Sequence, residues 1–266
     1  MVDPRLIQAV DALIRRHERQ HHVPLIAIAG AQGSGKSTLA AEAARTLSCA
    51  TLSLDDVYLT QAERADLAAR VHSLFAVRGP PGTHDLALLD RTLSRLREVG
   101  PGDHTPLPGF DKLADDRRPE SDWPVFVGRP RAVLLEGWQL GATPQDPAAL
   151  TAPINALERD HDPDGAWRRT INDALAGDYA RLFTTFDALI FLKAPDFDRV
   201  LDWRTEQEAG LTGAPVTASR RDELSRFVQH FERISRHMLA GGVAADVVVE
   251  LGDGRDIRRI RGSGRP

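Results

Sequence analysis

The sequence has a single cysteine, Cys49, among its 266 residues. One thiol cannot form a disulfide within the chain or supply a cysteine-based zinc cluster, and such sparse use of cysteine is typical of a reducing compartment. No apolar run approaches the roughly 20 residues that a membrane-spanning helix needs. Residues 1–6 (MVDPRL) also lack the apolar region of a signal peptide. We therefore expect a cytoplasmic protein with no membrane partner.

Charge of one sign is not in large excess either. The chain has 34 Lys and Arg against 38 Asp and Glu, a formal net charge of −4. This balance indicates no general affinity for nucleic acids, although a local basic pocket for phosphate groups is compatible with it. Two nucleotide-binding signatures, Asn-Lys-x-Asp and Leu-Ser-Gly-Gly-Gln, do not occur in the sequence. Their absence argues against a GTPase and a transporter ATPase.

One stretch organises the rest of the chain. Residues 30–37 match Gly-x-x-x-x-Gly-Lys-Ser, between an apolar run at 25–29 and an amphipathic helix. This strand, loop and helix are the context that a phosphate-binding P-loop requires. Glycines let backbone N–H groups turn toward phosphate oxygens, and the helix N-terminus adds a positive dipole end. The residues predicted to bind ATP are Gly30, Ala31, Gln32, Gly33, Ser34, Gly35, Lys36, Ser37 and Thr38.

Strands alternate with helices along the chain, which predicts an α/β fold with a parallel sheet and helices on both faces. We expect one P-loop kinase domain over residues 1–266. The expected strands are about 24–29, 51–54, 132–135, 188–192 and 247–251. The first expected helix covers residues 4–20. Later expected helices include 61–76, 86–100, 166–184, 196–210 and 221–240. Four other segments are predicted to be an insertion on the substrate side (about 100–131), a polar loop (141–165), a lid (about 203–222) and an irregular tail after 251.

Acidic residues stand at the ends of two of these strands. Ligands of parallel sheets bind at the carboxyl ends of the strands, where Asp55, Asp56 and Glu136 are found. An acid after the second strand can accept a proton from an attacking hydroxyl, bind Mg²⁺ or cap the next helix. We favour Asp55 as the catalytic base. Glu136 ends an apolar strand and is predicted, with Ser37 and Asp55, to form the Mg²⁺ site, while Lys36 reaches the phosphates.

Polar residues in two loops are candidate ligands of an anionic substrate. The Pro- and Gly-rich loop 78–85 contains three of them, and the insertion supplies cations that can bind an anion or the transferred phosphoryl group. Asp85 is equally suited to cap the helix that starts at 86. In the predicted lid, Arg204 is expected to neutralise charge on the transferred group. The candidate substrate ligands are Asp56, Tyr58, Arg78, His84, Asp85, Asp111, Lys112 and Arg117.

Five segments occur in an order that resembles the D-glycerate 3-kinase family, which is related to uridine kinase and phosphoribulokinase. They are GAQGSGKST at 30–38, SLDDVYLT at 53–60, RGPPGTHD at 78–85, PGFDK at 108–112 and LEGWQLG at 135–141. The resemblance covers about residues 24–251. It implies a nucleoside-monophosphate-kinase-like fold with a five-stranded parallel sheet in the order 2-3-1-4-5, and MgATP as the phosphoryl donor.

The resemblance also implies roles for individual positions. The acid that matches Asp55 is the base, the one that matches Glu136 belongs to the metal site, and His84 and Asp85 line the acceptor pocket. Arg204 matches the lid region. We therefore expect an ATP-dependent kinase for a small hydroxyl compound, with D-glycerate as the leading acceptor. The alternatives are a uridine kinase-like nucleoside kinase and a regulatory protein that binds ATP and hydrolyses it weakly. The sequence does not indicate an oligomeric state.

Overall fold

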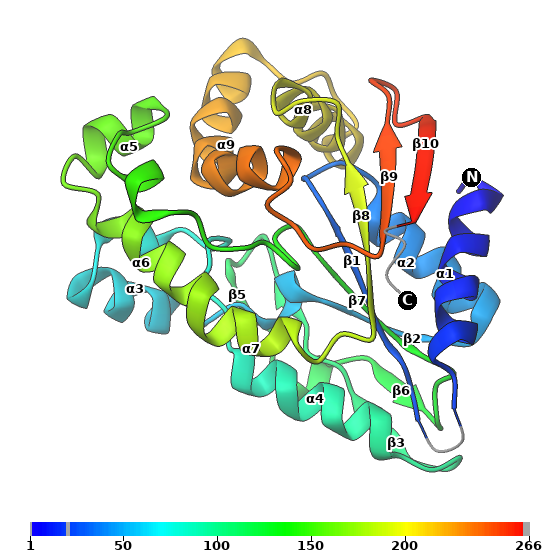
Figure 1. Cartoon of the computed structure of the whole chain (residues 1–266). Helices are drawn as coiled ribbons and strands as arrows, with labels where there is room; N and C mark the ends of the chain where they lie inside the picture. Colours follow the sequence, from blue (N-terminus) through cyan, green and yellow to red (C-terminus); the bar gives the residue numbers. More distant parts are fainter. Residues whose placement is uncertain (1, 20–21, 263–266) are drawn as a thin grey trace.

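The main sheet has six strands in the order β2-β7-β1-β8-β9-β10, and helices cover both of its faces (Figure 1). The computed structural model describes residues 2–19 and 22–262, apart from the side chains of 211 and 212. The strands of this sheet are β1 (Leu25–Gly30), β2 (Ala50–Ser53), β7 (Val133–Gly137), β8 (Ala188–Lys193), β9 (Val247–Leu251) and β10 (Ile257–Gly262). The helices are α1 (Pro4–His17), α2 (Lys36–Leu47), α3 (Gln61–Arg70), α4 (Leu86–Glu98), α5 (Ala156–His161), α6 (Ala166–Ala174), α7 (Ala180–Phe183), α8 (Asp198–Thr212) and α9 (Ala218–Leu239).

The expected five-stranded, all-parallel sheet is wrong in extent and in strand direction. The five strands from β2 to β9 are parallel neighbours, but the segment after β9 turns back and pairs with it as the antiparallel strand β10. This segment contains four arginines between 255 and 261, so it resembles a solvated tail in the sequence. Charged residues are common on edge strands because they discourage pairing with another chain.

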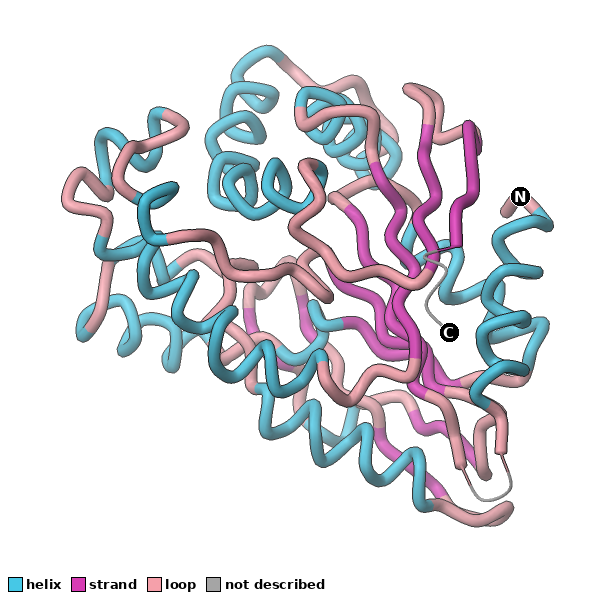
Figure 2. The backbone as a smooth tube through the Cα atoms, viewed as in Figure 1, coloured by secondary structure: helices cyan, strands magenta, loops and turns pink. Residues whose placement is uncertain are grey.

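Alternate residues of β1 build two separate cores, because successive side chains of a strand point to opposite faces. Leu25, Ala27 and Ala29 pack with residues of α4, α6 and α9. Ile26 and Ile28 pack with residues of α1 and α2. Figure 2 shows the strands enclosed between these helix layers. The P-loop therefore starts from a strand that is buried along its whole length.

Several predicted elements differ in their limits. The first helix ends at His17 rather than 20, and residue 20 lies outside the described part of the chain. The predicted helix at 61–76 divides into α3 and a short 3-10 helix, Ser73–Ala76. The one at 166–184 contains a π-helical turn, Leu175–Tyr179, between α6 and α7. The insertion forms two small hairpins, β3 (His104–Pro106) with β6 (Val125–Val127) and β4 (Phe110–Asp111) with β5 (Asp116–Arg117). No helix in residues 2–19 and 22–262 is long and apolar enough to span a membrane.

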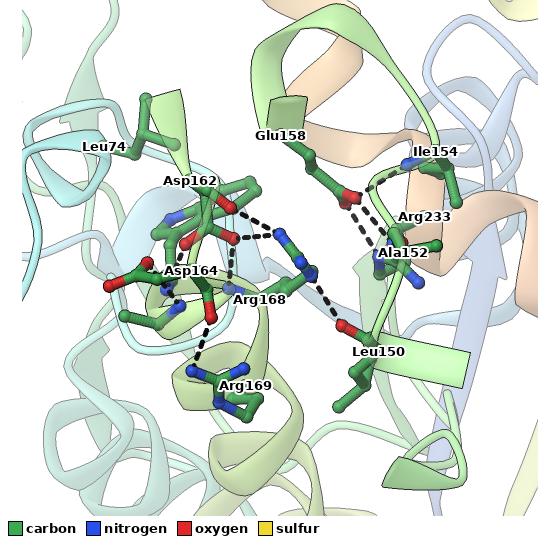
Figure 3. Close-up of polar contacts among 12 residues, drawn as sticks. Leu74, Leu150, Ala152, Ile154, Glu158, Asp162, Asp164, Arg168, Arg169 and Arg233 are labelled. Carbon is green, nitrogen blue, oxygen red and sulfur yellow. Dashed lines mark hydrogen bonds and ion pairs between the residues drawn. The ribbon is translucent and has the colours of Figure 1, made fainter. Parts of the chain in front are cut away.

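Two buried arginines order the segment that the sequence presents as a polar loop (Figure 3). Arg233 of α9 donates to both carboxylate oxygens of Glu158, at 2.7 and 2.6 Å, and to two backbone carbonyls. Arg168 of α6 pairs with Asp162 at 2.9 Å and donates to the carbonyl of Leu150. Glu158 and Asp162 are fully buried. The loop therefore contains helix α5 and is fixed against α6 and α9.

Substitution of Arg233 by Met is expected to lower the free energy of unfolding by about 3–5 kcal/mol, because Glu158 would keep an uncompensated buried charge. Urea denaturation measures this change. The matched control is Arg221→Met on the same helix. Its ion pair with Asp202 is exposed on both sides, so its loss should cost no more than about 1 kcal/mol. The double substitution Arg233→Met with Glu158→Leu should lose less than Arg233→Met alone. If Arg233→Met and its control lost the same free energy of unfolding, that result would contradict a structural role for the buried pair.

Candidate active site

The P-loop connects β1 to α2 through glycines that no other residue would replace without strain. Gly33 and Gly35 have φ angles of +76° and +94°, in the left-handed region that favours glycine. A Cβ atom on Gly33 would lie 2.6 Å from the Cβ of Trp203 in α8. The loop is therefore held close to α8 by a contact that leaves no room for a side chain.

The polar groups of this loop fit a bound triphosphate. The Lys36 ammonium is buried and donates to the Ala31 carbonyl at 3.1 Å, so it lies folded against the loop. Burial lowers its pKa, although Glu136 and Asp55 act in the opposite direction. The side-chain oxygens of Gln32 and Ser34 are buried without a hydrogen-bond partner in the described residues. Unpaired buried polar groups are rare in proteins. A phosphate oxygen would accept from the Ser34 hydroxyl, and a water bound to the phosphates would donate to Gln32 Oε1.

Ser37 and Glu136 bring together two oxygen atoms of the kind that Mg²⁺ binds. The Ser37 hydroxyl donates to Glu136 Oε1 at 2.9 Å, which joins the start of α2 to the end of β7. Mg²⁺ is usually bound by one or two such groups together with water and substrate phosphates. The described residues contain no cluster of three His, Cys, Asp or Glu side chains that would hold a metal without those extra ligands.

Asp55 is ionised and fixed in place by two partners. It lies in the 3-10 helix Leu54–Val57 directly after β2. Lys112 Nζ is 3.1 Å from its Oδ2, and the Tyr58 hydroxyl donates to its Oδ1 at 2.6 Å. Burial opposes ionisation of Asp55, but these two groups and Lys36 outweigh burial, so its pKa lies below the ordinary value.

Its neighbour Asp56 has the opposite tendency. Burial and the adjacent charge of Asp55 raise the pKa of Asp56 to about 6. Because their environments shift the two pKa values in opposite directions, the two carboxyl groups lose their protons at different pH. Near neutral pH, Asp55 is the one of the pair that is fully ionised and held by hydrogen bonds.

The ring of His84 packs against the ring of Tyr58. The two rings have centroids 4.7 Å apart, and Phe110 contacts the edge of the Tyr58 ring. The His84 imidazole is buried and its Nδ1 lies 2.5 Å from the Tyr179 hydroxyl. Burial lowers the pKa of His84 to about 3, so the ring is neutral. Tyr179 comes from the π-helical turn and is not among the predicted site residues.

Other predicted substrate ligands are occupied by groups of the protein. Asp85 caps α4 by accepting from the Leu88 N–H at 2.8 Å and also pairs with Arg117 at 3.3 Å. Arg78 forms an ion pair with Asp115 and lies 5.6 Å from the centroid of the Phe110 ring. Asp111 accepts from two backbone N–H groups of its own turn, those of Leu113 and Ala114. Asp111 therefore has a local role in the hairpin.

The predicted lid is a pair of helices, α8 and the start of α9. Arg204 pairs with Glu208 at 3.3 Å, and Glu208 also accepts from Arg220 at 2.6 Å. Burial lowers the pKa of Arg204, and the charges of Arg78 and Asp55 act on it as well. Arg204 is thus close enough to the Asp55 region for their charges to interact.

A further arginine supports the P-loop from the turn between β9 and β10. Arg255 Nε donates to the Gly33 carbonyl at 2.6 Å, and its guanidinium lies 5.0 Å from the centroid of the Trp203 ring. An ion pair joins it to Glu206 at 2.7 Å. Arg255 was not predicted as a site residue, because the polar segment after residue 251 is typical of an irregular tail. The glycines of a turn at 252 and 254 were the available signal.

The α/β sheet, the P-loop at the end of β1 and the acids at the ends of β2 and β7 define a P-loop kinase. Among proteins of known sequence, the chain is 33% identical over 221 residues to the uncharacterized kinase mug58 of Schizosaccharomyces pombe, covering 78% of each protein. It is 28% identical over 240 residues to the probable ATP-dependent kinase TDA10 of Saccharomyces cerevisiae, covering 77% of this chain and 74% of TDA10. The chain belongs to the kinase family of mug58.

Among solved structures, the fold is similar to that of D-glycerate 3-kinase from Cryptococcus neoformans var. grubii, with a TM-score of 0.75 and 20% sequence identity. The alignment covers 97% of this chain and 99% of that protein. This likeness confirms the kinase fold over nearly the whole chain. No family model matches the sequence.

Replacement of Gly33 by Ala is expected to weaken MgATP binding at least roughly tenfold. A left-handed backbone costs a residue with a Cβ about 1–2 kcal/mol, and the new methyl group would also collide with Trp203. Isothermal titration calorimetry with MgATP measures the loss. The control is Gly210→Ala in α8, where a Cβ would have no atom within 4 Å and where alanine favours the helix. Wild-type affinity in Gly33→Ala would show that the close contact with α8 does not shape the loop.

Proposed function

We propose that this kinase transfers the γ-phosphoryl group of MgATP to a hydroxyl of a small anionic acceptor, with D-glycerate as the acceptor that we favour. The observation that carries the proposal is the state of Asp55, an ionised carboxylate held by Lys112 and Tyr58. The charges of Lys36 in the P-loop and of Arg204 in α8 interact with that of Asp55. A base close to the phosphate-binding lysine suits an acceptor that attacks the γ-phosphorus.

In this mechanism the P-loop amides and Lys36 bind the phosphates, and Ser37 and Glu136 would hold Mg²⁺. When bound, the ion would neutralise part of the charge on the phosphate oxygens. The oxygen of the acceptor hydroxyl bonds to the γ-phosphorus while Asp55 takes up the hydroxyl proton. At the same time the bond between the γ-phosphorus and the β-phosphate oxygen breaks, so that ADP leaves. Arg204 stabilises negative charge on the transferred group. Helix α8, whose Trp203 lies against Gly33 of the P-loop, would help to exclude water from this reaction.

The preference for an anionic acceptor rests on the cations around Asp55. Lys112, Arg78 and Arg117 come from the loop 78–85 and the β4–β5 hairpin, and each is paired with an acid of the protein. A carboxylate on the acceptor would exchange with one of these internal acids, since ammonium and guanidinium groups bind carboxylates strongly. D-glycerate also agrees with the sequence motifs and with the fold of the Cryptococcus enzyme. We further infer that residues 1–266 act as one catalytic domain in the cytoplasm.

Substitution of Asp55 by Asn is expected to lower kcat by about 10²–10⁴-fold, the usual contribution of a general base, and to leave MgATP binding intact. A coupled assay of ADP release, with D-glycerate, L-glycerate, uridine and no acceptor, measures turnover and its acceptor dependence. Lys36→Ala should instead weaken MgATP binding, which calorimetry measures.

The matched control for this experiment is Asp66→Asn, because Asp66 forms an exposed ion pair with Arg70 on α3 and should behave as wild type. Turnover in Asp55→Asn at the wild-type rate would remove Asp55 as the base. ADP release that no acceptor increases would favour the weak-ATPase alternative over a kinase.

A further inference from the structure

His84 and Tyr179 form the end of a buried chain of hydrogen bonds. The backbone N–H of Gly82 donates to the Tyr179 hydroxyl oxygen at 3.1 Å, and that oxygen lies 2.5 Å from His84 Nδ1. Both residues are buried, Tyr179 with 1% and His84 with 6% of its surface exposed. The three groups come from two parts of the chain almost 100 residues apart, so the fold is required to assemble them.

The direction of these bonds fixes the position of the imidazole proton. The His84 ring is neutral because burial lowers its pKa to about 3, and Tyr179 keeps its proton because burial raises its pKa well above the ordinary value of a tyrosine. The Gly82 N–H can only donate, so the tyrosine oxygen accepts from it. The hydroxyl proton then has His84 Nδ1 as its acceptor, since the described residues offer Tyr179 no other. Nδ1 is therefore unprotonated, and the ring proton is on Nε2.

This tautomer leaves a hydrogen-bond donor without a partner. His84 Nε2 is buried and has no hydrogen-bond partner in the described part of the chain. The His84 ring packs against Tyr58, whose hydroxyl binds Asp55, and the charge of Asp55 acts on His84. A buried N–H without an acceptor is unfavourable and uncommon in folded proteins. One beside the proposed base is suited to a ligand oxygen.

We propose that Tyr179 is a positioning residue that holds His84 in its Nε2–H tautomer, and that this uncharged N–H donates a hydrogen bond to an oxygen of the phosphoryl acceptor. The role of the N–H rests on the proposed function, whereas the tautomer does not. A neutral donor can bind an acceptor oxygen without forming an ion pair with Asp55. An imidazolium would form that pair and weaken Asp55 as a base.

The tautomer can be measured without any substrate. In protein labelled with ¹⁵N-histidine, long-range ¹H–¹⁵N correlation spectra distinguish the two nitrogens, and loss of the signal in His84→Gln assigns it. We expect a single Nε2–H form in the wild type at pH 7. Tyr179→Phe keeps the ring but removes the hydroxyl, and should give a mixture of both tautomers. A proton on Nδ1 in the wild type, or an unchanged single form in Tyr179→Phe, would overturn the role of Tyr179.

Kinetics test the hydrogen bond to the acceptor. Tyr179→Phe should raise KM for D-glycerate roughly 3–10-fold, the range of one neutral hydrogen bond, with KM for ATP unchanged. His84→Gln places an amide N–H near the position of Nε2 and should retain more acceptor affinity than His84→Asn, whose shorter amide corresponds to Nδ1. Equal effects of the two His84 variants would contradict donation from Nε2.

The control Thr170→Val removes a different hydroxyl from α6, one bonded only to the Ala166 carbonyl among the described contacts, and should change neither the spectrum nor the kinetics. Thermal melting of each variant identifies any general loss of structure. If the wild type does not phosphorylate D-glycerate at all, the proposed acceptor is wrong. The tautomer spectra would still decide the inference about Tyr179.

Discussion

The negative charge on Asp55 has to be maintained on a partly buried side chain, which is 32% exposed, and much of the surrounding structure serves that requirement. Burial alone would favour the protonated acid. The ammonium of Lys112 and the hydroxyl of Tyr58 reverse this preference, and each depends on a different element. Lys112 is carried by the turn of the β4–β5 hairpin, whereas Tyr58 is fixed by its contacts with His84 and Phe110. The Asp55 carboxylate is therefore supported by the insertion as much as by the sheet.

Local sequence patterns were sufficient to predict the elements whose structure follows from nearby residues alone. The five parallel strands are short apolar runs, and residues 30–37 carry their loop geometry in the glycines, so both could be predicted from the sequence. The alternation of elements along the chain also gave the α/β class. Asp55 and Glu136 could be selected because they follow strands whose carboxyl ends share one edge of the sheet. Their roles in the reaction remain predictions.

The elements that were missed depend on contacts between distant residues. Arg233 and Glu158 look like solvated charges in the sequence, and only the fold shows that they pair in the interior. Tyr179 lies on a helix where aromatic residues usually pack in the core, and a π-helical turn gives its hydroxyl access to His84. Asp85 illustrates a real ambiguity of pattern, since one carboxylate both caps α4 and pairs with Arg117.

The strand β10 has a consequence for how the C-terminal part of the protein tolerates change. It covers one edge of β9, and the turn before it places Arg255 against the Gly33 carbonyl. A chain shortened to residue 251 would thus change in two ways. The edge of β9 would be unpaired, which favours self-association. The P-loop would also lose its contact with Arg255. Solubility and nucleotide affinity are in this way coupled through a segment that contains few apolar residues.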